Sequence, residues 1–433
     1  MSDISFVRTE MLPERAPPAS EVGVLGWVRH NLFSNWMNSI LTVVSLGAIY
    51  YVLAGVLPWV FLSVNAPSLS ECREIMIERW GSTHGHACWG VISDRWLQLL
   101  FGFYPKALYW RPILALLLLF AALAPVLFAD RVSNKLLYLT AIYPFLMPWL
   151  LWGGSIWGPI CAAMGFVIGY LVVKFVTDMA GTLIATIAAV VAAFAWWLLL
   201  SGPVSSALSS IIPLAIESVE SRQFGGFMLA ILLGVVAIGV SLPIGVVLAL
   251  GRQSDLMIIK YFCVGFIEFI RGVPLITLLF VASLLLNVFL PPGTNFDIIL
   301  RVMIMMTLFS AAYMAEVIRG GLAALPRGQY EGADSLGLNY WQAQRLIIMP
   351  QALKISIPGI VSTFIGIFKD TTLVSIIGLF DVIGLANAIR ADTAWIGIYW
   401  ELFAFIAVLF FIVCFGMSRY SMYLERKLQT GHR

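Results

Sequence analysis

Two pairs of opposite charges interrupt the apolar runs in the second half of the chain. Glu268 precedes Arg271 by three residues, Glu316 precedes Arg319 by the same interval, and a glycine follows each arginine. Residues three apart share one face of a helix and can form an ion pair. Charge inside a long apolar segment is costly unless it is paired or functional. Two interpretations stay open: the four side chains satisfy one another at a lipid boundary, or they brace an inner gate against the polar stretch that follows.

A further charged step, Lys369-Asp370-Thr371, lies well inside another apolar run. Adjacent residues on a helix point about 100° apart, so the lysine and the aspartate need different partners or a locally opened helix. An uncompensated charge at this depth would cost several kcal/mol, which favours a cavity or a helix interface over lipid. One interpretation is a path for a polar solute, to which Tyr313 would also contribute. The other is structural pairing with a charged residue of a neighbouring span.

Catalytic and metal-binding patterns are missing from the sequence. The four histidines, at positions 30, 84, 86 and 432, all fall outside the apolar runs, and no lysine directly follows a glycine, as a P-loop would require. The five cysteines show no C-x-x-C spacing, so a metal motif is unsupported. We therefore expect no enzyme activity, cofactor or metal in this chain, and we find no footprint of nucleic-acid binding.

Cys72 and Cys88 enclose His84 and His86 in a polar segment. In an oxidising compartment the two cysteines can form a disulfide bond, which would close a loop of about 15 residues and contribute about 3 kcal/mol. Two free thiols are the alternative. A zinc site built from all four residues is a third possibility, although His-x-His-x-Cys is not a usual structural spacing.

The elements that must hold these side chains are membrane helices. Of the 433 residues, 61% are hydrophobic and 11% are charged, and the mean hydropathy is +0.93, whereas soluble domains are about half apolar and a quarter charged. The apolar runs, about 17 to 26 residues long, lack the alternation of a barrel. We predict an all-α membrane protein with about ten spans, near residues 38–63, 112–128, 136–152, 159–177, 182–200, 225–250, 261–289, 298–318, 355–378 and 396–417. Eight is the competing count, because the runs between 112 and 177 are short and crowded.

Basic residues predict the orientation, because short cytoplasmic loops are enriched in Lys and Arg. With alternating spans they gather on one side, together with both chain ends: Arg131, Lys135, Arg252, Lys260, Arg327, Arg345, Lys354, Arg419 and Arg426. Both termini are therefore expected to be cytoplasmic. The expected division is a polar tail at 1–36, a membrane block at 37–205 with a translocated loop at 64–111, and a second block at 206–433.

Residues 319–354 are a polar stretch too long for a tight turn, which suggests a docking surface. Within it, small, charged and apolar residues recur at a recognisable spacing: Glu331, Ala333, Gly337, Ile347 and Pro350. This spacing is similar to the cytoplasmic loop signature of ABC importer permeases, Glu-Ala-Ala, Gly, then Ile-x-Leu-Pro. The chain departs from that signature twice, with Gly332 in place of the first alanine and Met349 in place of the leucine.

Further segments over about residues 220–420 resemble the polar amino acid permeases of the histidine and glutamine class. They are Phe269-Ile-Arg-Gly-Val-Pro-Leu275, Ser310-Ala-Ala-Tyr-Met-Ala-Glu316, Leu325-Pro-Arg-Gly-Gln329, Pro350-Gln-Ala352 and Phe368-Lys-Asp-Thr371. The additional first block makes the chain similar to the M-type subunit of the general L-amino acid permeases of proteobacteria. The resemblance implies a C-terminal five-helix type I ABC importer permease core in the bacterial inner membrane, with the loop at 64–111 in the periplasm.

The same resemblance implies a mechanism and partners. A short helix ending near Gly337 would enter a groove of an ATPase, with Glu331 as its anchor and Pro350 starting the return to the bilayer. The ATPase subunits would bind ATP and Mg²⁺, a periplasmic binding protein would deliver L-amino acids, and a second, different permease chain would complete the pore. The alternative is an ion-coupled secondary transporter of a small polar solute. A purely structural or receptor protein would have no reason for the 319–354 loop.

Overall fold

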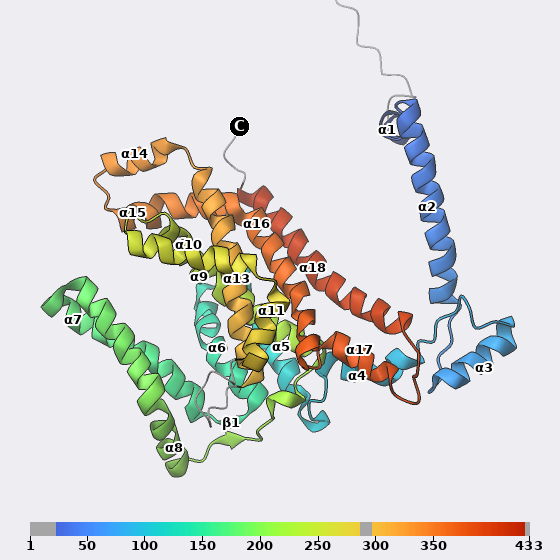
Figure 1. Ribbon diagram of the computed structural model, residues 1–433, viewed down its shortest axis with the longest axis horizontal. Coiled ribbons are helices and arrows are strands. Elements are labelled where there is room, and N and C mark those ends of the chain that lie inside the picture. The colour runs from blue at the N-terminus through green and yellow to red at the C-terminus, as the bar shows by residue number, and fades with distance from the viewer. Residues whose placement is uncertain (1–22, 286–296, 429–433) are drawn as a thin grey trace, which may run out of the picture. The chain divides into compact units, whose positions relative to one another are not determined.

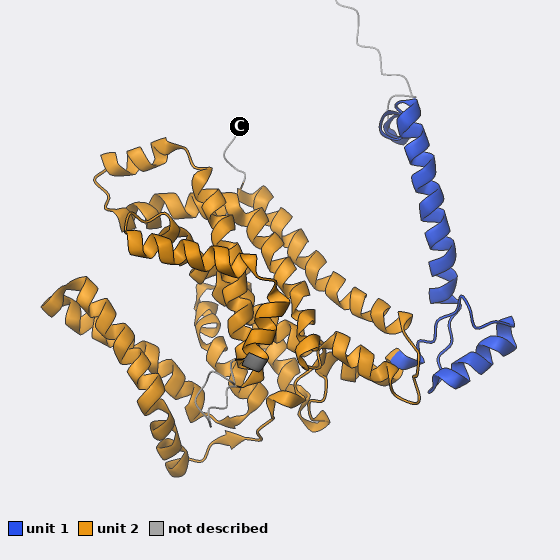
Figure 2. Ribbon diagram, in the orientation of Figure 1, with its two compact units in different colours: residues 1–91 blue, residues 92–433 orange. Residues whose placement is uncertain are grey.

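The computed structural model of the protein describes residues 23–285 and 297–428, most of them in helices (Figure 1). Most of the predicted tail at 1–36, the end of the predicted span at 261–289, and the chain end with His432 lie outside the described residues. The chain separates into two compact units, residues 1–91 and residues 92–433 (Figure 2).

Unit 1 contains one long apolar helix. After α1 (Gly23–Asn31), α2 (Trp36–Phe61) begins at Asn35, whose side chain accepts a hydrogen bond from the backbone N–H of Asn38. With 26 residues α2 is about 39 Å long, enough to cross the hydrocarbon core of a bilayer. None of its side chains is buried, so its exposed apolar surface fits a lipid environment.

A small disulfide-bonded segment follows α2. Cys72, on α3 (Leu69–Trp80), forms a disulfide bond with Cys88, so neither thiol can serve a zinc site. His86 stacks on Trp80 with the ring centroids 4.0 Å apart. Among the described residues, no group of three or more His, Cys, Asp or Glu side chains could hold a metal ion.

The first half of unit 2 is a layer of helices beside the core. Its elements are the main part of α4 (Gly90–Phe101), η1 (Lys106–Leu108), α5 (Trp110–Leu127), η2 (Asn134–Leu136), α6 (Leu137–Trp152), β1 (Gly154–Ser155), α7 (Trp157–Ala195), η3 (Trp196–Leu200), α8 (Ser201–Ile211), β2 (Ala215–Ile216) and η4 (Ser221–Gln223). Side chains of α5 and α6, such as Leu119 and Met147, share one buried apolar cluster with Leu232 of the core. This shared cluster attaches the first block to the second.

α7 is a helical hairpin rather than one rod. Its chain breaks at Gly181, which has φ +80°, a conformation that glycine adopts without strain. Across the two arms, the Nε1 of Trp196 and the Nε1 of Trp197 donate to the carbonyls of Cys161 and Ala162 at 2.7 and 2.9 Å. These contacts require the arms to run antiparallel, as predicted from the separate runs at 159–177 and 182–200.

The second half of unit 2 is the helical core. Its elements are α9 (Gly226–Arg252), α10 (Met257–Gly272), α11 (Leu275–Phe280), η5 (Val281–Leu285), α13 (Ile298–Ala323), α14 (Arg327–Ser335), α15 (Tyr340–Ala343), η6 (Gln344–Ile348), α16 (Met349–Asp370), η7 (Thr371–Ile377), α17 (Val382–Arg390) and α18 (Trp400–Leu428). Small residues let α9 and α13 approach closely: a Cβ on Gly245 would lie 2.7 Å from the Cβ of Met314. Close packing of this kind is typical of membrane helices.

In the described part of the predicted span at 261–289 the chain is bent and does not form one straight helix. α10 and the segment from Leu275 to Ser283 are bent by 100° at a break, where Pro274 has no N–H to donate and pushes Val273 into an extended conformation. By length and composition, eight described helices can cross a membrane, or nine if this bent pair is one span. The stretch from Trp157 to Ile211 is counted once there, although it doubles back at Gly181. Ten, the predicted number, is reached only when its two arms are counted separately and the bent pair is counted as one span.

Candidate functional site

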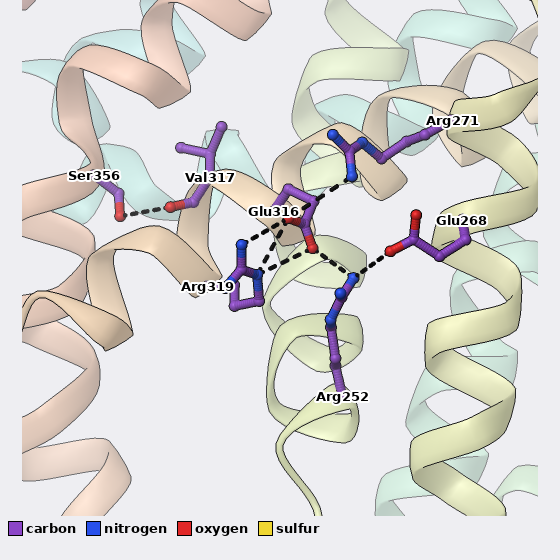
Figure 3. A network of polar contacts seen from close by, with 7 residues as sticks. All are labelled: Arg252, Glu268, Arg271, Glu316, Val317, Arg319 and Ser356. Atoms are coloured by element: carbon purple, nitrogen blue, oxygen red, sulfur yellow. Dashed lines mark hydrogen bonds and ion pairs between the residues drawn. The ribbon is translucent and has the colours of Figure 1, made fainter.

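An ionic cluster with Glu316 at its centre lies where α9, α10 and α13 meet (Figure 3). One carboxylate oxygen of Glu316 is 2.6 Å from Nη1 of Arg252, and the other is 3.0 Å from Nη2 of Arg319 and 3.7 Å from Nη1 of Arg271. The same Nη1 of Arg252 is 2.9 Å from Glu268. Three guanidinium groups therefore surround one carboxylate, with a second carboxylate at the edge.

Each member of the cluster comes from the end of a helix. Arg252 is the last residue of α9, Glu268 and Arg271 lie in the last turn of α10, and Glu316 and Arg319 lie near the end of α13. The last two are three apart and pair along one helix face, as predicted. Ion pairs between these ends tie the three helices together.

The expected pairing of Glu268 with its neighbour Arg271 is wrong, because both residues bond to other helices. Glu268 forms its ion pair with Arg252, and Arg271 forms its ion pair with Glu316. The guanidinium carbon of Arg271 also lies 5.5 Å from the ring centroid of Tyr313. Arg252 was expected only among the basic residues that predict the orientation, and not in the site. A signal was nevertheless present in the sequence. Arg252 comes just after the apolar run predicted at 225–250, on the side of the membrane where the two Glu-Arg pairs were also expected.

Close contact of α13 with α16 fixes the other side of the cluster. The hydroxyl of Ser356 donates to the carbonyl of Val317 at 3.2 Å, as Figure 3 shows. A Cβ on Gly321 would lie 2.0 Å from that hydroxyl and 2.5 Å from the carbonyl oxygen of Ala352. Only glycine permits this approach, so α16 packs directly against the helix that carries Glu316.

After the end of α13, the 319–354 stretch folds into the short helix α14, a turn, and the helical segment that leads into α16. α14 ends at Ser335, Gly337 follows with φ +71°, and the turn into α15 is held by a capping box between Asn339 and Gln342. Pro350 lies in the first turn of α16, directly after the π-helical turn η6. This geometry agrees with the short helix predicted to end near Gly337. In Figure 1, α14 runs across the direction of α13 at one end of unit 2.

Burial separates the residues of this loop into two groups. Ala333 and Ile348 are buried, whereas Glu331, Gly332, Gly337 and Pro350 are exposed and Ile347 is half-buried. Large apolar side chains beside them also face outward, with 74% of Leu336 and 71% of Trp341 exposed. An exposed carboxylate next to exposed apolar groups makes a surface suited to a protein partner.

The Lys369-Asp370-Thr371 step marks a change of helix type. α16 ends at Asp370, and the chain continues as the tighter 3₁₀ helix η7 as far as Ile377. Thr371 is buried and its hydroxyl donates to the carbonyl of Phe368 at 2.7 Å. Within the described ranges, no ion pair involves Lys369 or Asp370. Tyr313 contacts Arg271 and Phe309, so it belongs to the ionic cluster.

Long apolar helices around an ionic cluster, with a structured polar loop at one end, are the architecture of a multi-span membrane protein. Residues 241–430 match the family of binding-protein-dependent transport system inner membrane components. The chain is 60% identical over 436 residues to the glutamate/glutamine/aspartate/asparagine transport system permease protein BztC of Rhodobacter capsulatus, with 100% of both chains covered. It is 38% identical to the inner membrane amino-acid ABC transporter permease protein YhdY of Escherichia coli K12, with 97% of each covered.

A shorter relative matches only part of the chain. The glutamate/aspartate import permease protein GltK of Escherichia coli O157:H7 is 30% identical over 208 residues, which are 47% of this chain and 91% of that relative. The chain belongs to the family of amino-acid ABC transporter permeases, which are inner-membrane transport proteins and not enzymes. The predicted family, and the predicted permease core in the C-terminal half, are confirmed.

Proposed function

We propose that this permease carries L-amino acids from periplasm to cytoplasm as one subunit of an ATP-driven importer. The observation that carries the proposal is the full-length similarity to a permease named for glutamate, glutamine, aspartate and asparagine. An acidic amino acid or its amide has one carboxylate and one ammonium at its α-carbon, which Lys369 and Asp370 can match in charge. Both residues lie at the end of α16, beside the buried Thr371.

In this proposal the loop from Glu331 to Pro350 docks on an ATPase subunit. Support comes from the short α14, the exposed Glu331 and the exposed apolar side chains of Leu336 and Trp341. The ATPase binds ATP and Mg²⁺, since no lysine follows a glycine in this chain as a P-loop requires. Movement of α14 reaches α16 through the π-helical turn η6, which joins α15 directly to α16.

The ionic cluster then acts as the inner brace of the transport path. Glu316 and its three arginines join α9, α10 and α13 at the end of unit 2 that also carries α14 (Figure 1). A pull on α16 acts on α13 at Gly321 and so changes the separation of these helix ends. The loop lies on the cytoplasmic side in this proposal, and so do both termini.

The remaining partners follow from the importer class. A periplasmic binding protein delivers the amino acid, and a second, different permease chain faces the core across the path. The ion-coupled alternative is not favoured, because the full-length relatives are ABC permeases or transport-system permeases.

Uptake into proteoliposomes tests the proposal. We expect uptake of acidic amino acids and their amides to require enclosed ATP, the ATPase, the second permease chain and the binding protein together. Neutral aliphatic amino acids serve as the matched panel for selectivity. Uptake driven by an ion gradient without ATP would refute the ATP-driven mechanism, and equal uptake of the whole panel would refute the substrate class.

A further inference from the structure

Helix α4 of the added N-terminal half is bonded to the segment that joins α17 to α18. The guanidinium of Arg95 is 3.0 Å from the carboxylate of Asp392, and Nε1 of Trp395 donates to the carboxylate of Asp94 at 3.1 Å. Trp395 is completely buried. The two side chains of the ion pair are 28% and 34% exposed, so this contact is partly desolvated rather than a loose surface pair.

The other end of α17 is held by the residues just after α4. The rings of Phe103 and Phe380 meet edge to face with centroids 5.2 Å apart. A Cβ on Gly225 would lie 2.5 Å from the carbonyl oxygen of Phe380 and 3.1 Å from the Cα of Gly102, and the N–H of Gly226 donates to that carbonyl at 2.8 Å. Three backbone segments thus meet where only glycine fits.

These two contacts place both ends of α17 against α4 and its following turn. α17 comes directly after η7, which begins at Thr371, and directly before α18. In Figure 1, α4 and α17 lie at the end of unit 2 opposite to α14. The segment held by α4 is therefore the outer end of the candidate substrate path.

α4 lies outside the family match, which begins at residue 241, whereas α17 lies within it. The contact consequently joins the addition to the shared permease core. A core without the addition must position α17 by other means, so α4 supplies a function specific to chains with the first block.

We propose that α4 is a positioning element for transport: Asp94 and Arg95 hold α17 and the 391–399 connection in place over the outer entrance. This rests on the proposed transport function. Arg95 acts through Asp392 and touches no substrate. Loss of the contact lets the outer segment shift, so the loaded binding protein delivers its solute less effectively, while the ATPase loop at the opposite end is unaffected.

The test compares Arg95→Ala, Arg95→Lys and Asp392→Asn in the reconstituted importer, with Lys106→Ala as the control. The asparagine retains an oxygen for the backbone N–H of Ala394, which now donates to Asp392 at 3.0 Å, and removes only the charge. Lys106 is exposed and lies just beyond α4. Uptake is measured against the concentration of loaded binding protein and normalised to the amount of folded permease.

We expect Arg95→Ala and Asp392→Asn each to raise KM about fivefold with Vmax within twofold, as loss of a pair worth about 1 kcal/mol gives. The variant that combines Arg95→Ala with Asp392→Asn should have a KM no higher than either single variant. Arg95→Lys keeps the positive charge and should have a KM close to that of the wild type. A KM equal to that of Lys106→Ala, or a loss confined to Vmax and protein abundance, would overturn the positioning role. Inactive wild-type complex would instead refute the proposed function itself.

Discussion

Replacing Glu316 by glutamine removes the one negative charge that three arginines share. The amide keeps the size of the side chain but leaves Arg252, Arg271 and Arg319 close together, and among the described residues Glu268 is then the one carboxylate paired with them. At an effective dielectric constant of about 20, each pair at these distances is attracted by about 4 to 6 kcal/mol before desolvation. Side chains of the arginines are 24%, 34% and 42% exposed, so the net contribution per pair falls to about 0.5 to 1 kcal/mol.

The summed loss for Glu316→Gln is therefore about 2 kcal/mol, including repulsion among the remaining arginines. For a chain of this size that corresponds to a fall of about 2 to 4 °C in the unfolding temperature. Thermal unfolding of the purified protein in detergent measures it, with Glu74→Gln as the control because Glu74 is exposed. The difference should shrink in high salt. Equal unfolding temperatures for the two variants at low salt would refute the cluster as a brace.

Three further changes test other parts of the molecule. Gly337→Val forces a β-branched residue to φ +71°, which costs about 1 to 2 kcal/mol; uptake and co-purification of the ATPase should be lost while the affinity of the binding protein for solute is unchanged, and normal uptake would contradict the docking role. Burial raises the pKa of Asp381 to about 6 from its usual 3.8, so the folded state keeps this proton to a higher pH than the unfolded state. The resulting stability, on the order of 3 kcal/mol, is full below about pH 4 and is lost as the pH rises to about 6. Asp381→Asn should flatten the fall in unfolding temperature between pH 4 and 6, and an unchanged slope would argue against it. Cys72→Ser should lower the stability of unit 1 by about 3 kcal/mol, and peptide mapping without reductant should find Cys72 joined to Cys88 in the wild type and not as free thiols.

Helix type and the polar loop could be predicted because both are local. The length of an apolar run is enough to predict a membrane helix. The turn after α14 was likewise expected at Gly337, because glycine permits the positive φ found there. The Glu316–Arg319 pair was likewise predictable, since both residues lie on one helix face three positions apart.

Contacts between distant helix ends could not be predicted in the same way. Arg252 meets Glu316 across 64 positions, and Arg95 meets Asp392 across 297 positions; no periodicity links such residues. The bend between α10 and α11 had a local signal, Pro274, but a membrane helix tolerates proline when neighbours satisfy the freed backbone groups, as Pro243 inside α9 illustrates. Whether a proline breaks a span thus depends on packing that the sequence does not contain.

The helical hairpin that turns at Gly181, whose second arm continues through η3 and α8, has a consequence for the order in which the chain enters the membrane. Its two arms are joined by bonds from Trp196 and Trp197, and its base is closed where β1 pairs with β2, Gly154 opposite Ile216. Phe166 on the first arm also meets Phe145 on α6. All of these partners are synthesised by residue 216, before α9 begins at Gly226. The hairpin is therefore a self-contained insertion unit, which can assemble in the bilayer while the ribosome is still making the permease core.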